Sequence, residues 1–300
     1  MVDNVNNKEN DIRPVLIIYP TLFSLLILNY LVYQKKVKFA GVILSVAHIK
    51  TKGVSFSFPE SSYILLRRTG VWYATYLLFM IKGAYLFLLF WRISGFFTGK
   101  KVELRTFSKI FKEYGIPVFK SEDINNEAAV NFMRDINANF IVSIYNNQIL
   151  RYQTCKKFTY GAIGIHNSYL PDFGGLDAAF EGLFHFVKET GTTAHYVDTG
   201  IDTGDVICQE KISIDPMDTV FSLNIRQWIK GAQMIPLVLD QIEKGNVKVK
   251  KQDFSKVQYP YQSFPSKERV KEFHRKQKNC IRLREVFILN EFLCNVFGVR

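Results

Sequence analysis

Cysteine is scarce in this chain, and its cysteines form no recognisable motif. Four occur in 300 residues, without a C-x-x-C pair: Cys155, Cys208, Cys280 and Cys294. This spacing argues against a disulfide framework and against the common cysteine-based metal sites. We therefore expect no metal and a reducing, cytoplasmic location. Association with a membrane is left open.

Two further signals are missing. The first expected strand is not followed by G-x-G-x-x-G, so dinucleotide binding through the usual glycine loop is not supported. Met1 to Asp11 are polar and rich in asparagine, without a basic region leading into an apolar one. We predict a flexible tail over residues 1–13 and no signal peptide.

Acidic residues are outnumbered by basic ones. The chain has 39 Lys and Arg against 27 Asp and Glu, a formal net charge of +12. This balance favours an anionic partner such as a nucleotide, a polyglutamyl tail, a membrane surface or RNA. A lysine-rich composition without functional meaning explains the charge equally well. With 48% hydrophobic residues, the chain is expected to bury a sizeable core.

Long uncharged stretches are confined to residues 57–98. Residues 71–81 and 83–91 carry no charge and are separated by Lys82. A membrane span needs about twenty apolar residues, and this lysine lies in the middle of the candidate. We expect a helical hairpin that is buried or forms a dimer face. One alternative is contact with a membrane surface through residues 63–97, which the flanking arginines and tryptophans would suit. The other alternative is a helix that spans the membrane.

The spacing of apolar runs predicts a doubly wound α/β sheet. Strands are expected at 15–19 and 37–46 around a helix at 22–33, which is the start of a parallel sheet. Strands at 116–119 and 140–145 flank a helix at 127–136. A long helix is expected after Asp218 and extends to Ile242, with Pro236 inside it. A basic helix is expected to run from Ser266 toward Arg284. We predict about seven mostly parallel strands with one twisted core.

The most informative part of the sequence is residues 161–207. A β-branched run ends at His166 and is followed by a Leu-Pro turn and two glycines. A second short strand, 192–197, leads into a loop with three acids: Asp198, Asp202 and Asp205. Two strand ends therefore deliver an imidazole and a carboxylate toward one cleft. This suits proton transfer, because histidine titrates near neutrality and a carboxylate can orient its ring and stabilise its cation.

As an ordered string, these residues resemble the folate-dependent formyltransferase family. The family is typified by N-x-H-x-S-L-L-P-x-x-x-G, followed by T-x-H-x-V-x-x-x-x-D-x-G. Residues 164–171 with Gly175 fit the first block, and His195, Val197, Asp202 and Gly204 fit the second. The resemblance implies a Rossmann-like core over residues 14–245, with residues 57–98 as a helical insertion. Residues 246–300 would be a basic C-terminal extension.

The resemblance also implies a role for each matched residue. His166 and Asp202 would be catalytic, with His166 relaying the amine proton and Asp202 holding the ring in register. His195 and Ser168 would support them. The formyl donor, 10-formyltetrahydrofolate, would be bound by residues near the strand ends: Gln148, Ile149, Leu150, Val197 and Asp198. For Ile149 and Leu150, an ordinary place in the core explains the sequence equally well.

The chain departs from the family pattern at Gly164. The family has there an Asn that donates a hydrogen bond to the formyl oxygen as negative charge develops on it. Loss of one such donor costs about a hundredfold or more in rate. Asn146 and Asn147, at the end of a neighbouring strand, are the candidate replacement donors, and an Asx turn is the alternative for both. Asn167 suits this role less, because alternation along a strand points it to the opposite face.

We therefore predict transfer of a formyl group from 10-formyltetrahydrofolate to a primary amine, a reaction of one-carbon metabolism. The expected acceptor is an amino sugar on a nucleotide or glycoconjugate precursor. The alternatives are a non-catalytic module that binds folate or a sugar nucleotide, and a 10-formyltetrahydrofolate hydrolase. A methionyl-tRNA formyltransferase fits less well, since its tRNA-binding β-barrel is larger than residues 246–300. Nucleic acid is not an expected partner, and a homodimer is an open expectation.

Overall fold

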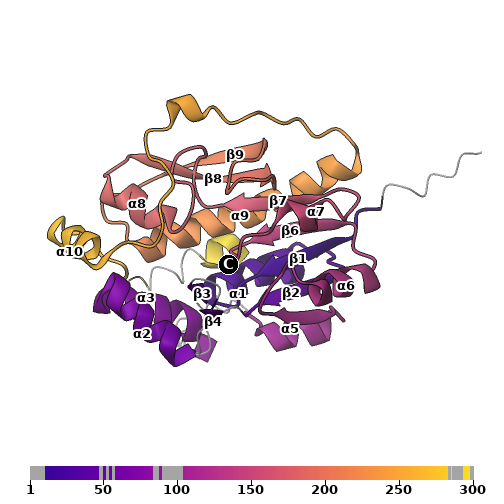
Figure 1. Ribbon diagram of the computed structural model, residues 1–300, viewed down its shortest axis with the longest axis horizontal. Helices are drawn as coiled ribbons and strands as arrows, with labels where there is room; N and C mark the ends of the chain where they lie inside the picture. Colours follow the sequence, from indigo (N-terminus) through magenta and orange to yellow (C-terminus); the bar gives the residue numbers. More distant parts are fainter. Residues whose placement is uncertain are drawn as a thin grey trace, which may run out of the picture.

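The computed structural model describes residues 11–46, 50–51, 54–55, 58–83, 88–89, 104–282, 285 and 293–297. Most of the predicted tail therefore lies outside the described residues. The described chain contains a seven-stranded sheet in the order β5-β2-β1-β6-β7-β8-β9 (Figure 1). The first five strands in this order are parallel, and the last two are antiparallel to their neighbours. The predicted mostly parallel α/β sheet is confirmed.

The parallel strands are short, and the central ones are buried because helices cover both faces of the sheet. Their bounds are β1 Pro14–Ile18, β2 Gly41–Ser45, β5 Val118–Ser121, β6 Phe140–Ile144 and β7 Ala162–His166. The antiparallel edge consists of β8 (Glu189–Tyr196) and β9 (Val206–Ser213). A separate small hairpin pairs β3 (Lys50–Thr51) with β4 (Val54–Ser55).

Two differences from the expected strands have simple causes. β2 is shorter than the predicted 37–46, because Lys36 has a left-handed φ of 57° and the chain is still turning out of the preceding helix. β9 was not predicted. Six of its eight residues are partly or fully exposed, so its apolar alternation is weak, as at many sheet edges.

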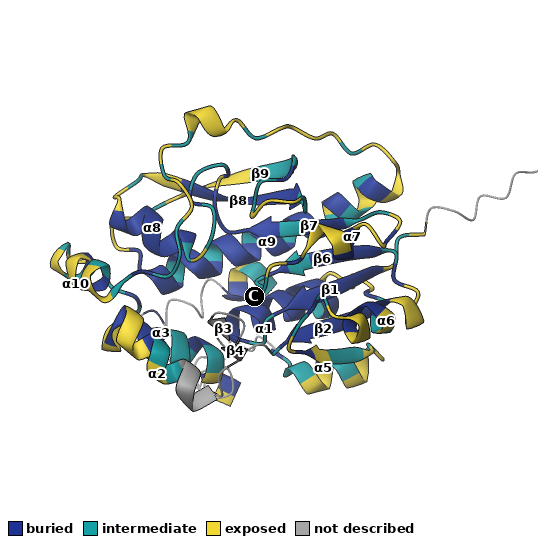
Figure 2. Ribbon diagram, viewed as in Figure 1, coloured by how far each residue is buried: buried dark blue, intermediate teal, exposed yellow. Residues whose placement is uncertain are grey.

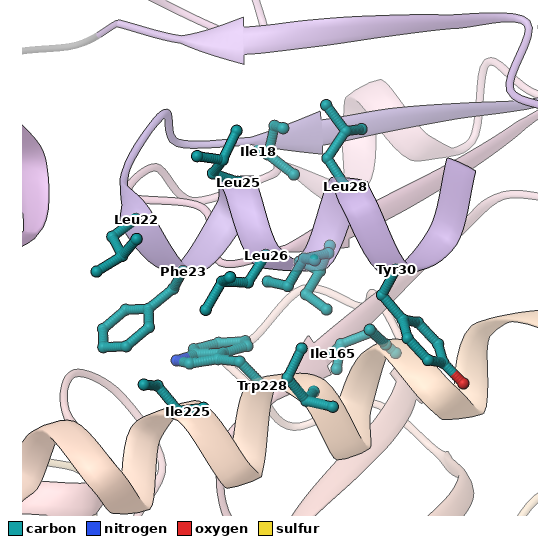
Figure 3. Packing of buried hydrophobic residues seen from close by; sticks show 14 of the residues in the cluster. Ile18, Leu22, Phe23, Leu25, Leu26, Leu28, Tyr30, Ile165, Ile225 and Trp228 are labelled. Atoms are coloured by element: carbon teal, nitrogen blue, oxygen red, sulfur yellow. The ribbon is translucent and has the colours of Figure 1, made fainter. Parts of the chain in front are cut away.

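Helices cover both faces of the sheet. On one face, α1 (Leu22–Leu28), which continues into the π-helical turn η1 (Asn29–Gln34), packs beside α9 (Val220–Glu243). Figure 3 shows side chains of α1 meeting Ile225 and Trp228 of α9. On the other face lie α6 (Glu127–Asp135) and α7 (Tyr152–Cys155), while α5 (Phe107–Glu113) precedes β5. α8 (Ala178–Phe184) contacts α9 near the end of β7.

The described part of the insertion is helical, as predicted. α2 (Phe58–Thr69) and α3 (Val71–Lys82) form a hairpin, and Tyr73, Tyr76 and Met80 of α3 are buried in the main core. The outer side of the hairpin is exposed, with Trp72 at 72% (Figure 2). The burial of α3 agrees with the buried-hairpin interpretation for these residues, and membrane contact stays a prediction. Among the described residues, none of the helices combines the length and apolar character that crossing a bilayer requires.

Beyond α9 the chain returns across the molecule as an extended segment that contains the short helical turn η2 (Phe254–Lys256) (Figure 1). We call residues 250–262 the C-terminal strap. It is bridged to β9 by Lys250 and to the turn after β7 by Gln262. α10 follows and spans Lys267–Arg275. The predicted continuation of this helix to Arg284 is wrong, because Gln277 adopts a left-handed φ of 59°, which ends a helix.

Candidate active site

His166 is the last residue of β7, at the carboxyl end of the parallel strands. Ligands of doubly wound sheets bind at this edge. Because side chains alternate along a strand, Gly164 and His166 share one face, while Ile163 and Ile165 join the core on the side of α9. His166 is almost fully buried, at 6% exposure. Its ring is therefore held in place by the protein and not by solvent.

A backbone carbonyl fixes the tautomer of the His166 ring. Nε2 lies 2.9 Å from the main-chain oxygen of Phe173. A carbonyl oxygen only accepts hydrogen bonds, so Nε2 carries the hydrogen and Nδ1 of the neutral ring is bare. Nδ1 lies 3.6 Å from Oδ2 of Asp202. The imidazole and the carboxylate that the sequence pointed to therefore lie side by side.

Asp202 occupies the loop between β8 and β9 with a left-handed φ of 56°. Aspartate is one of the few residues that adopt this conformation without large strain. Its Oδ2 accepts a hydrogen bond from the main-chain N–H of Gly175 at 2.9 Å. Its main-chain oxygen accepts another from the side-chain amide of Gln252 at 2.8 Å. The loop is thus tied both to the turn after β7 and to the C-terminal strap.

His195 approaches the same carboxylate from β8. Its Nδ1 lies 2.8 Å from the main-chain oxygen of Tyr196 and carries the hydrogen for the reason given for His166. Its Nε2 lies 3.9 Å from Oδ1 of Asp202. Burial lowers the pKa of His195, while the charge of Asp202 and the hydrogen bond to Tyr196 work in the opposite direction.

The two rings therefore turn bare nitrogens toward opposite oxygens of one carboxylate. A bare nitrogen and a carboxylate oxygen are both acceptors, so a hydrogen bond forms between them only when a proton is added. The arrangement can take up a proton and stabilise it, because the negative charge of Asp202 favours an imidazolium on either side. This is the chemistry of a general base.

Hydrogen bonds from neighbouring strands hold the segment that follows His166. Ser168 is fully buried, and its hydroxyl donates to the main-chain oxygen of Asp172 at 2.7 Å. The hydroxyl of Thr193 donates to the main-chain oxygen of Ser168 at 2.7 Å. From α9, the amide of Gln227 donates to the main-chain oxygen of Asn167 at 2.5 Å. Ser168 therefore shapes the turn, and its supporting role in the reaction stays a prediction.

The residues predicted to bind the donor lie in two adjacent places. Gln148 donates to the hydroxyl of Ser45 at 2.6 Å. Ile149 is 58% exposed, whereas Leu150 is buried and shares a core cluster with Val197. Asp198 shapes its own loop, since its Oδ1 accepts hydrogen bonds from Gly200 and Thr203. Binding of the donor by these residues stays a prediction.

Both candidate replacement donors make hydrogen bonds, Asn146 within its own loop and Asn147 with Ser45 at the end of β2. The side-chain nitrogen of Asn146 donates to the main-chain oxygen of Gln148 at 2.8 Å, and Gln148 N–H returns a longer bond of 3.4 Å. The side-chain oxygen of Asn147 accepts from Ser45 at 2.5 Å. Asn167 bonds to Asn224 on α9, on the face opposite His166. Asn146 thus adopts the turn-forming role that the sequence left open as its alternative.

Sequence reasoning missed the groups that reach the site from far along the chain. Gln252 holds the Asp202 loop, and Tyr73 of the insertion hydrogen-bonds Asp177 at the start of α8. Asp177 was detectable as a helix N-cap before an apolar run. No local signal marks Gln252. Within the residues that the structure describes, no group of three or more His, Cys, Asp or Glu side chains could hold a metal ion.

Known proteins are similar to this chain in sequence and in fold. Residues 98–239 match the formyl transferase family model. The methionyl-tRNA formyltransferase of Geobacter metallireducens is 33% identical over 155 residues, 52% of this chain and 50% of that protein. That of Halothermothrix orenii is 29% identical over 163 residues, 54% of this chain and 52% of that protein. The chain thus spans about half the length of these curated relatives.

Solved structures agree on the fold. Phosphoribosylglycinamide formyltransferase from Anaplasma phagocytophilum superposes with a TM-score of 0.53 at 19% identity, covering 84% of this chain and 100% of that one. A 4-N formyltransferase from Francisella tularensis gives 0.51 at 14% identity, covering 84% and 76%. The matched segment contains β5 to β9, with both His166 and Asp202. Residues 98–239 are therefore similar to the formyl transferase family in sequence, and the chain shares the fold of these solved formyltransferases.

Proposed function

We propose that the protein transfers a formyl group from 10-formyltetrahydrofolate to a primary amine. The observation that carries this proposal is the position of the Asp202 carboxylate, 3.6 Å from Nδ1 of His166, in a formyl transferase segment. The bond from Nε2 of His166 to Phe173 keeps Nδ1 bare in the neutral ring. The site is thereby prepared to accept a proton at the edge of the sheet where substrates bind.

The reaction moves a formyl group between two nitrogens. The acceptor nitrogen loses a proton, the donor nitrogen gains one, and the formyl oxygen carries negative charge in between. The bound folate supplies the formyl group. The chain's own residues move the proton: His166 receives it at Nδ1, and Asp202 stabilises the resulting imidazolium. Gly175 and Gln252 hold Asp202 in position for this.

The loop after β6 suits a flat, partly apolar donor. Ile149 presents an exposed side chain beside the buried Leu150, while Asn125 fixes the loop by donating to the main-chain oxygen of Ile149 at 2.9 Å. An apolar surface on a backbone held by hydrogen bonds is typical of a preformed ligand site. We propose that this surface, with Gln148, Val197 and Asp198, holds the folate.

For the acceptor, we propose an amino sugar carried by a nucleotide or a glycoconjugate precursor. The net charge of +12 supports an anionic acceptor of this kind. An N-formyltransferase from Helicobacter canadensis, solved with folinic acid and dTDP-3-aminofucose, has a related fold with a TM-score of 0.50 at 15% identity, over 84% of this chain and 71% of that one. The curated relatives point to methionyl-tRNA as the acceptor to be tested against it.

One assay separates the candidate functions. The protein is incubated with 10-formyltetrahydrofolate alone, with a panel of amino-sugar nucleotides, and with methionyl-tRNA, and tetrahydrofolate release is followed by absorbance. Release that requires an amino sugar supports the proposal. Release that requires methionyl-tRNA would show that methionyl-tRNA, and not an amino sugar, is the acceptor. Release without any amine would indicate a hydrolase. Donor binding without release under any condition would leave a binding module.

A further inference from the structure

Gly164 lies directly across the strand pair from His195. The two residues are partners in the register of β7 and β8 and lie on the face that carries His166. A Cβ atom on Gly164 would lie 2.9 Å from Nε2 of His195 and 3.1 Å from Cε1. Glycine weakens a strand and often marks a place where another group approaches the backbone closely. Here the approaching group is the imidazole of His195.

The ring of His195 is fixed in this place. Its Nδ1–H donates to the main-chain oxygen of Tyr196 at 2.8 Å, and the residue is only 4% exposed. Nε2 therefore has one orientation, between the backbone of Gly164 and Oδ1 of Asp202 at 3.9 Å. Gly164 itself is only partly buried, so this edge of the ring borders the open side of the strand. An imidazole nitrogen thus occupies the space where any other residue at position 164 would place its side chain.

We propose that His195 is a second catalytic imidazole. A primary amine is protonated at neutral pH, so His166 takes the first proton from the ammonium, which frees its lone pair. Nε2 of His195 takes the second proton when this nitrogen attacks, and then donates it in a hydrogen bond to the formyl oxygen. This inference rests on the proposed formyl transfer. It assigns to His195 the part that the sequence assigned to an amide from Asn146 or Asn147. Gly164 is then the residue that makes room for this ring.

Each proton and electron pair in this step has a place. The lone pair of the acceptor nitrogen forms the new C–N bond, which leaves negative charge on the formyl oxygen and positive charge on the nitrogen. A proton passes from that nitrogen to Nε2, and the new N–H faces the charged oxygen. When the bond between the formyl carbon and the donor nitrogen breaks, the donor nitrogen keeps the electron pair and takes the proton from the ring. His195 returns to its neutral state, and His166 releases the first proton to solvent.

The charges around His195 agree with a ring that starts neutral. Burial is the largest influence and lowers its pKa below the usual 6.5, and the nearby His166 acts in the same direction. Asp202 and Asp198 oppose this by favouring the charged ring. At neutral pH the ring can therefore accept a proton, and Asp202 stabilises the cation as it forms.

A double-mutant cycle tests the pairing of Gly164 with His195. His195→Ala should lower kcat by about a hundredfold and leave KM within a few-fold, as for loss of an acid–base group. Gly164→Ala should also lower kcat, because its Cβ displaces the ring. In the His195→Ala background, Gly164→Ala should have no further effect. Gly174→Ala is the matched control, because a Cβ there has no atom within 4 Å.

The inference would be overturned if the double variant lost kcat by the product of the two single-variant losses. It would also be overturned if His195→Ala kept the full kcat. Circular dichroism and thermal melting of each variant show whether the fold persists. If the variants fail to fold, imidazole ¹⁵N NMR of the wild-type chain decides the geometry. We expect a neutral His195 with hydrogen on Nδ1 and a pKa below 6.5 that falls further in Asp202→Asn.

Hydrogen on Nε2 of the neutral ring, or a pKa insensitive to Asp202→Asn, would contradict the inference. The two proposals fail in different ways. A wild-type protein that formylates no amine overturns the proposed function and the role of His195 with it. A wild-type protein with turnover, alongside a fully active His195→Ala variant, overturns only the role of His195.

Discussion

The side-chain amide of Gln252 donates to the main-chain oxygens of both Asp202 and Gly204, at 2.8 Å in each case. Gln252 lies in the C-terminal strap, fifty residues beyond the Asp202 loop. One side chain therefore fixes two carbonyls of the turn in which Asp202 adopts its left-handed φ of 56°. The strap holds the Asp202 loop in the backbone conformation that directs the carboxylate between two imidazoles.

Gln252→Ala should lower kcat by about tenfold, because a misplacement of a catalytic group by about 1 Å can cost up to a hundredfold. Steady-state kinetics with the acceptor found in the panel measures this. The exposed neighbour Lys251 provides the control, and Lys251→Ala should keep the wild-type kcat. A Gln252→Ala variant with unchanged kcat would show that the Asp202 loop keeps its conformation without the strap.

His166→Ala should remove nearly all turnover, and Asp202→Asn should lower kcat by about 10²- to 10⁴-fold. Asparagine keeps the size of Asp202 and an oxygen for the N–H of Gly175, but it supplies no negative charge to stabilise an imidazolium. Asp205→Asn, in the same loop, is the control and should retain most activity. Substantial turnover in His166→Ala would move the proton-transfer role to another group.

The sequence predicted the parts of the site that depend on short, ordered strings. The apolar run before His166 specifies a buried strand, and that strand delivers the ring to the carboxyl end of the sheet. The loop of three acids places Asp202 close to it, and the spacing to Gly204 distinguishes Asp202 from the other two. Both steps depend on neighbours within a few residues, so the pattern suffices.

The sequence did not predict contacts between segments that are far apart along the chain. The position of His195 over Gly164 follows from the register of an antiparallel pair, which the sequence alone does not specify. For Asn146, the sequence allowed either a donor to the formyl oxygen or a turn, and the hydrogen bonds to Gln148 show the turn. The strap contact of Gln252 with Asp202 depends on how residues 250–262 cross the sheet, and no pattern in the sequence encodes that path.

The strap is also anchored by an aromatic pair. Tyr259 stacks on Phe173 with ring centroids 4.5 Å apart and planes 10° from parallel. Tyr259→Ala should lower the free energy of unfolding by about 1–3 kcal/mol, from the lost pair and the lost burial. Urea denaturation measures the change. Phe254→Ala, at a strap position that is 50% exposed, should have a smaller effect. Equal losses at both positions would argue against the stacking as the anchor.

Glu181 is a buried acid whose ionisation should make stability depend on pH. It is 2% exposed, and its carboxylate lies 2.5 Å from Arg269 of α10 and 3.6 Å from His185. Burial raises the pKa of Glu181 from 4.5 to about 7, although the charge of Arg269 works against the rise. The folded protein thus binds a proton on Glu181 in a pH range where the unfolded chain has released it.

The direction of the pH effect follows from this difference. Between pH 4.5 and about 7 the folded state holds more protons than the unfolded state, so the free energy of unfolding falls as pH rises through this window. Glu181→Gln removes the titrating group, and its melting temperature should change less over the same range than that of the wild type. Glu189→Gln, at an exposed glutamate paired with Lys211, should keep the wild-type pH dependence. If Glu181→Gln and the wild type show the same slope, the Arg269 ion pair keeps Glu181 charged throughout, and α10 is then held to α8 by a permanent ion pair.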